Sequence, residues 1–431
     1  MIKPFIDMFK NKDLRNRILF TLAMLFIYRL GAGITVPMVD NTKLMAMISD
    51  DSLFAMMNTL GGGALEQFSI FALGVGPYIN ANIIVHLLSM DVIPALTEMA
   101  KSGATGRMQM DRVTRYLAVA LAFIQSFTMT YGFDVSYGLI NNPSIAKYLY
   151  IATLLSAGSM FAMWLGDQIT VKGIGNGISM LIFTGIVSNL PFQFIQAFQS
   201  MVDTSSSQAM FNGVLGFAAY LIVYFAIIVL VIFTETAVRK VPIQYTSSSV
   251  KRGGNEMTFL PLKINSAGVI PVIFASSVMM APITVMSFME PTEFSETLKN
   301  ILSFNKPIGL TIYIVLIIFC TFFYSNLQVD PDKISENLNK SGTYIPGIRP
   351  GKETTEYLKK VLNRITVLGA AMLCFIAALP QLISMFTTLP SSVSVGGTGM
   401  IIVVGVALET MRQLKGSLTT RSYRGFVDNR K

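Results

Sequence analysis

Residues 61–88, GGGALEQFSIFALGVGPYINANIIVHLL, form a hydrophobic segment whose first part cannot cross a membrane. Three consecutive glycines are poor helix formers, and Glu66 and Gln67 interrupt the apolar run, so residues 61–70 need a cavity lined by protein. Beyond this part the segment is apolar, and Pro77 predicts a kink. We interpret the segment as a half-inserted element that occludes a pathway. The alternative is a short re-entrant loop that only fills space.

The composition of the whole chain is that of a membrane protein. Hydrophobic residues make up 52% of the chain and charged residues only 13%, against about 25% in soluble domains. Cys320 and Cys374 lie inside apolar runs, where a thiol acts as a small hydrophobic group. The two cysteines predict neither a disulfide framework nor a metal site, and no cofactor is expected.

Ten apolar segments have roughly the length that a bilayer requires of a helix. They are residues 18–34, 71–88, 116–133, 149–165, 174–195, 214–234, 267–289, 308–324, 367–386 and 398–414. The chain is therefore predicted to be an all-α polytopic membrane protein. Before these segments, residues 1–17 place apolar side chains on one face, which predicts a cytoplasmic amphipathic helix on the membrane surface.

The basic residues predict the orientation of the segments. Most of the 33 lysines and arginines lie in the termini and in the loops on the same side. Since basic residues favour the cytoplasmic side, both termini are predicted to be cytoplasmic. The same side holds two long loops, 235–266 and 325–366, and the tail 415–431.

The ten segments divide into two halves, residues 18–195 and 214–414. Because each half has an odd number of segments, the halves insert with opposite topology, and inverted halves place a pathway at their interface. The polar linker 196–213 is predicted to act as a hinge between them. The expected architecture is two inverted five-helix halves around a central hourglass-shaped pore.

Few side chains in the apolar segments could couple transport to ions or catalyse a reaction. His86 is the only histidine and lies near a segment end, as do Asp167, Glu235 and Glu409. Polar contacts between helices or at the interface are the usual roles there. The glycines of GIGNG, residues 173–177, lack the complete nucleotide-binding pattern and predict close helix packing.

An enzyme is not expected from these residues. A small-solute secondary transporter is the alternative to a channel that is driven by another molecule.

The two long cytoplasmic loops are too basic to be simple connections, and they predict a docking surface. In the second loop, Pro331 can start a short helix, and the sequence SGTYIPGIRPG follows it. Prolines and glycines on both sides of Arg349 predict a turn that holds one guanidinium at its tip. In the first loop, Lys251 and Arg252 add charge to this surface.

Five motifs together resemble the SecY family, the channel subunits of the bacterial protein translocon. They are GGGALEQFSIFALGVGPYI (61–79), MWLGDQITVKGIGNGIS (163–179), LPLKINSAGVIPVIFASS (260–277), SGTYIPGIRPG (341–351) and GGTGMIIVV (396–404). The likeness runs from about residue 13 to the tail. It implies a channel in the bacterial inner membrane that conducts unfolded preproteins and opens sideways to release hydrophobic segments into lipid.

The resemblance also implies which residues close the pore. Matched by motif, the apolar constriction of the family corresponds to Ile79, Ile83, Ile178, Ile182, Ile273 and Ile402. Within each helix, the pairs at a spacing of four share one face. Stiff β-branched side chains can close around a moving chain and exclude ions.

Three further sets of residues follow from the resemblance. The family's plug corresponds to residues 58–69, with candidate residues Gly61, Gly62, Gly63, Ala64, Leu65, Glu66 and Gln67. A lateral gate is expected between the second and third segments and the seventh and eighth, with polar contacts from Asn80, Asn82, Gln125, Ser276 and Ser277. Docking of the SecA ATPase or a ribosome is expected at Lys251, Arg252, Arg349, Pro350 and Gly351. SecE and SecG are the expected membrane partners.

Overall fold

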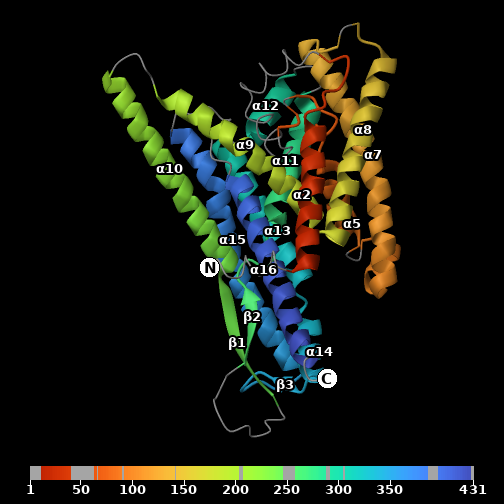
Figure 1. Ribbon diagram of the computed structural model, residues 1–431, viewed down its shortest axis with the longest axis vertical. Helices are drawn as coiled ribbons and strands as arrows, with labels where there is room; N and C mark the ends of the chain where they lie inside the picture. The colour runs from red at the N-terminus through yellow and green to blue at the C-terminus, as the bar shows by residue number, and fades with distance from the viewer. Residues whose placement is uncertain are drawn as a thin grey trace.

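The protein is described by a computed structural model. It covers residues 11–39, 63–65, 67–89, 92–140, 142–202, 207–245, 258–287, 292–303, 306–386 and 397–428. Long helices run along the longest axis of the molecule, and a small sheet lies at one end together with the carboxyl terminus (Figure 1).

The amino-terminal half is a bundle of helices. Its elements are α2 (Lys12–Ala32), α5 (Gly76–Leu88), α6 (Pro94–Lys101), α7 (Gly103–Tyr137), α8 (Ile145–Lys172) and α9 (Gly177–Met201). Helix α7 lies between α5 and α8, and α8 in turn contacts α2 and α9. The apolar faces of these helices are thus buried against one another.

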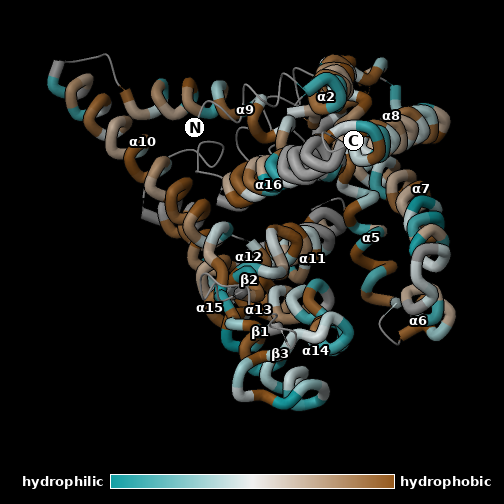
Figure 2. The backbone as a smooth tube through the Cα atoms, turned by 60° about the horizontal axis from the view of Figure 1, so that its bottom comes forward, coloured by the Kyte–Doolittle hydropathy of each residue, from teal (hydrophilic) through white to brown (hydrophobic). Residues whose placement is uncertain are grey.

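The carboxyl-terminal half has its own bundle and also contacts the first one. Its helices are α10 (Ser207–Thr236), α11 (Ile270–Ser287), α12 (Glu293–Leu302), α13 (Pro307–Gln328), α14 (Pro331–Lys340), α15 (Lys352–Phe386) and α16 (Gly397–Asp428). Helix α13 packs against α11 and α15, while α9 contacts both α10 and α16. Apolar residues predominate along α9 and α10, whereas α14 is mostly polar (Figure 2).

Every one of the ten predicted segments contains a helix. In the described residues, six helices are long and apolar enough to cross a membrane, namely α7, α8, α9, α10, α13 and α15. The other four segments contain α2, α5, α11 and α16. The predicted fold class, a polytopic helical membrane protein, is confirmed, with the addition of a small sheet that the sequence analysis did not foresee.

The second segment begins differently from the prediction. Residues 71–75 form turns, and α5 starts only at Gly76, with Pro77 in its first turn. Gly74 has a positive φ of 53°, which favours glycine, and its carbonyl accepts a hydrogen bond from Ser159 Oγ at 2.8 Å. This contact with α8 satisfies a backbone group that the helix does not, so the break is tolerated at membrane depth.

All four predicted boundaries between the parts of the chain lie inside helices. Helix α2 already begins at Lys12, while the first ten residues lie outside the described part. Helices α9 and α10 extend into both ends of the predicted hinge 196–213, and α16 continues to Asp428 through most of the predicted tail. An apolar run marks only the part of a helix that faces lipid or protein, and a polar continuation without a breaker remains helical.

The two long loops fold together into a small domain at the end of the bundle. Strand β1 (Val238–Tyr245) pairs antiparallel with β2 (Thr258–Lys263), with Val238 opposite Lys263, and also with β3 (Thr343–Tyr344). The apolar core beneath the sheet consists of Val241, Ile243, Leu262, Ile345, Leu358, Leu362 and Ile365. Since three of these come from loop 235–266 and the others from β3 onward, the two loops are one structural unit.

Candidate functional site

Five of the six isoleucines matched to the constriction meet in one apolar cluster, which we call the ring cluster. These are Ile79 of α5, Ile178 and Ile182 of α9, Ile273 of α11 and Ile402 of α16. The side chains of Ile182 and Ile402 are buried and the other three are half-buried. The cluster therefore joins two helices of one half to two helices of the other.

Ile83, the sixth isoleucine, is also buried but lies outside the ring cluster, one turn further along α5. Its position shows why a spacing of four is an incomplete guide. Ile79 and Ile83 share one helix face but lie one turn apart along the helix axis, so they contact different neighbours.

The start of α9 is fixed by close packing against α8. Gly177 lies so near the carbonyl oxygen of Gly166 that a Cβ at residue 177 would collide with it. The Gly177 N–H donates to Thr170 Oγ1 at 2.8 Å, and Asn176 caps the helix by accepting from the N–H of Ile178 at 3.1 Å. The GIGNG glycines thus serve helix packing, as expected, and they hold the ring isoleucines of α9 in place.

The plug candidates divide into two groups. Gly61, Gly62 and Glu66 lie outside the described residues, whereas Gly63, Ala64, Leu65 and Gln67 lie inside them. Ala64 is fully buried and belongs to the same cluster as the ring isoleucines. Leu65 is 1% exposed, while Gln67 is exposed, so the apolar plug candidates in the described part of the chain are enclosed by protein.

The gate candidates lie on the helices expected to form the gate. Asn80, Asn82 and Gln125 are half-buried, and α5 contacts α11. Ser276 is buried and donates its hydroxyl hydrogen to the Ile273 carbonyl of its own helix at 2.8 Å. In the described ranges no hydrogen bond joins the three amides or Ser277 to the facing helices, whereas Ile79 of α5 and Ile273 of α11 belong to the same apolar cluster.

The candidate docking turn, residues 346–351, presents Arg349 to solvent. Gly347 and Gly351 have φ angles of 80° and 102°, which form the sharp turn on either side of the arginine. Thr354 Oγ1 donates to the Arg349 carbonyl at 2.9 Å, and the Arg349 side chain is 88% exposed, with Glu353 Oε1 at 3.9 Å from Nη1. The backbone is therefore fixed while the guanidinium stays available, and Pro350 lies in the same turn.

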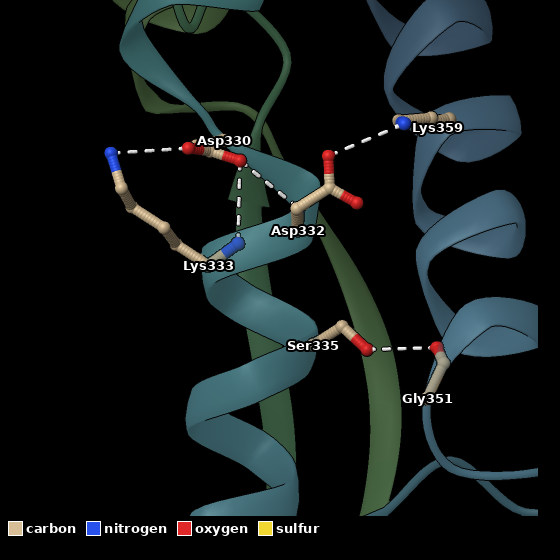
Figure 3. Close-up of polar contacts among 6 residues, drawn as sticks. All are labelled: Asp330, Asp332, Lys333, Ser335, Gly351 and Lys359. Atoms are coloured by element: carbon tan, nitrogen blue, oxygen red, sulfur yellow. Dashed lines mark hydrogen bonds and ion pairs between the residues drawn. The ribbon is translucent and has the colours of Figure 1, made fainter. Parts of the chain in front are cut away.

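Helix α14 braces the docking turn (Figure 3). The Ser335 hydroxyl donates to the Gly351 carbonyl at 3.0 Å, and Asp332 pairs with Lys359 of α15 at 3.3 Å. Asp330 caps α14 by accepting from the N–H groups of Asp332 and Lys333. Pro331 starts the helix as predicted. Lys251 and Arg252, the other docking candidates, lie outside the described residues.

The capping carboxylate has a lowered pKa. Partial burial raises the pKa of Asp330, but the hydrogen bonds and the ion pair with Lys333 outweigh it, so the pKa lies below its usual value. The cap is therefore ionised at neutral pH, the state in which it accepts both backbone hydrogen bonds.

Sequence reasoning did not single out Asn265. This buried side chain donates to Glu235 Oε1 at 2.7 Å and to the Gly268 carbonyl at 3.1 Å, and so ties the end of α10 to the turn before α11. The sequence did contain a signal for this residue, since the asparagine interrupts the apolar motif 260–277.

Asp167 makes an ion pair with Arg115 at 2.9 Å, as an interfacial carboxylate does.

The described residues offer no metal centre. No group of three or more histidine, cysteine, aspartate or glutamate side chains in these ranges could hold a metal ion. Cys320 and Cys374 are buried and unpaired by disulfides. The site that the structure does present is an apolar junction between two helical halves, with an exposed turn around Arg349 at one end.

Comparisons with known proteins agree with this geometry. The chain matches the SecY family over residues 69–411. It is 45% identical to the protein translocase subunit SecY of Bacillus subtilis strain 168, with 100% of both chains covered.

Two solved structures share the fold. One is described as showing that the plug domain of the SecY protein stabilises the closed state of the translocation channel (TM-score 0.69, 17% identity), and the other as Sec61 in the canine ribosome-channel complex (TM-score 0.62, 16% identity). Each match covers 93% of this chain and 91% of the other. With an apolar junction between two helical halves, a helical membrane fold and full-length similarity in hand, we conclude that this chain belongs to the SecY family.

Proposed function

We propose that this chain is the polypeptide-conducting channel of a bacterial protein translocase. The observation that carries the proposal is the ring cluster, in which isoleucines from both halves meet. Rigid apolar side chains at such a junction exclude water and ions, yet they can separate to admit an extended chain. Unfolded preproteins are the substrate.

The ring and the plug work together in this proposal. Ala64 packs with the ring isoleucines, so the resting pore is closed by the ring and by the segment that contains Ala64. An entering polypeptide has to move both. Release of hydrophobic segments into lipid occurs between α5 and α7 on one side and α11 and α13 on the other, where the apolar contact of α5 with α11 parts.

The docking partners in this proposal are the SecA ATPase and the ribosome. Both would use the exposed Arg349 turn and the small sheet domain, whose position beyond the bundle makes it accessible (Figure 1). The Bacillus relative is named a subunit of a translocase, and the canine Sec61 structure contains a ribosome. SecE and SecG are the proposed membrane subunits, and lipid covers the remaining apolar surface.

The protein is a multi-pass membrane protein, and its proposed location is the bacterial inner membrane. The sheet domain and the carboxyl terminus lie at the same end of the molecule (Figure 1), and many of the basic residues belong to that end. By the positive-inside rule this end is cytoplasmic.

Small-solute transport is the less favoured function. Such a transporter usually binds its substrate and coupling ion through polar or ionisable side chains near the middle of the membrane. The side chains at the junction of the halves are instead isoleucines. Solute-dependent uptake by the purified chain would reverse this preference.

Crosslinking tests the channel function directly. A photoreactive residue replaces Ile79, Ile182 or Ile402, and a secretory chain is stalled during translocation. We expect all three positions to crosslink to the stalled chain, and a photoreactive residue at the lipid-exposed Phe225 of α10 to serve as the negative control. Crosslinks at Phe225 but at none of the ring positions would contradict the proposal.

A further inference from the structure

The segment that contains Ala64 packs against a second apolar cluster as well as the ring. We call Ala64, Leu65, Phe68 and Ser69 the plug turn, and the second cluster the seat. The seat consists of Val36, Met129, Phe133, Leu139, Ile140, Tyr148, Ile151 and Leu155. Leu65 and Phe68, each 1% exposed, are buried in the seat, and the Phe68 ring stands edge-on to Phe133 at a centroid distance of 6.2 Å.

Backbone hydrogen bonds join the plug turn to the chain just after α2. The Val36 N–H donates to the Phe68 carbonyl at 3.0 Å, and the Ile70 N–H donates to the Ile34 carbonyl at 3.0 Å. The same stretch then pairs with the loop after α7 through a bridge between Val39 and Ile140. A short ladder therefore connects the plug turn to Ile140.

The carboxylate of Asp134 fixes the far end of this ladder. Asp134 is buried, its Oδ1 accepts from the Ile140 N–H at 2.7 Å, and its Oδ2 accepts from the Tyr148 hydroxyl. The Gly138 N–H also donates to the Asp134 carbonyl at 2.7 Å, which ends α7 in a left-handed turn. Ile140 and Tyr148 both belong to the seat, so one side chain holds two of its walls.

A buried carboxylate is costly unless it is fully hydrogen-bonded, so its partners are held firmly in this geometry. We propose that Asp134 is a positioning residue that holds the seat in shape and thereby keeps the plug turn in the closed position. The inference rests on the proposed channel function and extends it to a control on the resting state. Asp134 acts through Ile140 and Tyr148 and does not touch the substrate.

The test measures resting ion conductance in planar bilayers for the full complex without substrate. Asp134→Ala removes both hydrogen bonds, and we expect about a tenfold rise in conductance, the change that about 1.4 kcal/mol produces in an equilibrium constant. Tyr148→Phe removes one hydroxyl and should give a smaller rise. Asp134→Asn keeps an acceptor for Ile140 and an amide for Tyr148, so its conductance should stay near that of the wild type.

A matched control separates the seat from general packing of α7 on α8. Ser126 Oγ lies 3.0 Å from Ser156 Oγ and donates to the Ala152 carbonyl, so it joins the same two helices beside the seat through hydrogen bonds that do not involve Asp134. Ser126→Ala should lower thermal stability without a leak. In addition, Phe68→Ala alone should raise the resting ion conductance. Adding Asp134→Ala to that variant should raise the conductance little further, because both residues act through the seat.

The outcomes separate this inference from the channel function. If the wild-type complex translocates preproteins but neither Asp134→Ala nor Tyr148→Phe raises the resting ion conductance, the inference is overturned and the channel function stands. A leak in Ser126→Ala equal to that in Asp134→Ala would overturn it as well. Failure of the wild-type complex to translocate any preprotein would instead overturn the channel function.

Discussion

Isoleucine and glycine residues have different roles around the junction of the two halves. The isoleucines fill the space between helices of the two halves, whereas Gly166 and Gly177 let α8 and α9 of one half pack closely, which fixes the position of Ile178 and Ile182 on α9. A β-branched side chain has few rotamers, so the ring cluster is stiff as well as apolar. Its seal depends on both residue types.

Replacing the six matched isoleucines by glycine should open the resting pore to ions. The substitution removes the apolar side chains that exclude water, so ion conductance of the complex in planar bilayers should rise well above that of the wild type. Six lipid-exposed apolar residues of α10 changed to alanine provide the control. A silent membrane with the ring variant would contradict the assignment of these residues to the pore.

Gly177→Ala should destabilise the protein, because its Cβ would meet the carbonyl of Gly166 and force α9 away from α8. Overpacking of this kind costs about 1 to 3 kcal/mol. Gly216→Ala is the matched control, since Gly216 lies within α10 and no atom stands within 4 Å of its added Cβ. Thermal unfolding in detergent should show a loss of stability for the first variant and none for the second.

Among the secondary-structure elements, the helices followed from the sequence and the sheet did not. Apolar runs of bilayer length are a strong local signal, so each predicted segment contains a helix. Strands β1 and β2 contain Pro242 and Pro261, and β3 has only two residues, so nothing local indicated their pairing. The seat around Asp134 was missed for the same reason, because it joins parts of the chain that are distant in sequence.

The docking turn is the element on which an energy-supplying partner should act. Arg349→Glu reverses the exposed charge at its tip, and ATPase-driven translocation should fall by about tenfold or more, the effect of losing about 1.4 kcal/mol of binding. Folding should be unaffected, since the side chain is exposed. Translocation assays with membrane vesicles measure the effect.

Lys360→Glu is the control for this prediction, because it makes the same charge change on the exposed surface of α15 outside the turn. It should translocate nearly as well as the wild type. Equal loss in both variants would mean that net charge, and not the turn, determines docking.

Across the whole molecule, the two halves are held together by several separate contacts. Phe194 of α9 stands edge-on to Tyr224 of α10 at a centroid distance of 4.9 Å. Near the start of α2, Leu14 packs with Leu414 of α16. The Gly175 N–H donates to Gln413 Oε1 at 3.1 Å. Together with the ring cluster, these contacts join the two halves at several separate places.

The halves should therefore remain associated when the connection between them is cut. We expect that a protease site placed within residues 203–206, cleaved after purification, leaves two fragments that migrate as one species on a native gel. The reason is that the contacts between helices of the two halves do not depend on the covalent connection. Separation of the fragments in mild detergent would show that the connection, and not the interface, holds the molecule together.

Helix α15 links events outside the bilayer to those within it. Leu358 and Leu362 belong to the core of the sheet domain, and further along the same helix Leu373, Ile376 and Ala377 are buried in the membrane bundle. A single continuous helix, Lys352–Phe386, therefore joins the core of the sheet domain to the core of the membrane bundle. A partner that moves the sheet domain would therefore transmit that movement along α15 to the buried residues of the bundle.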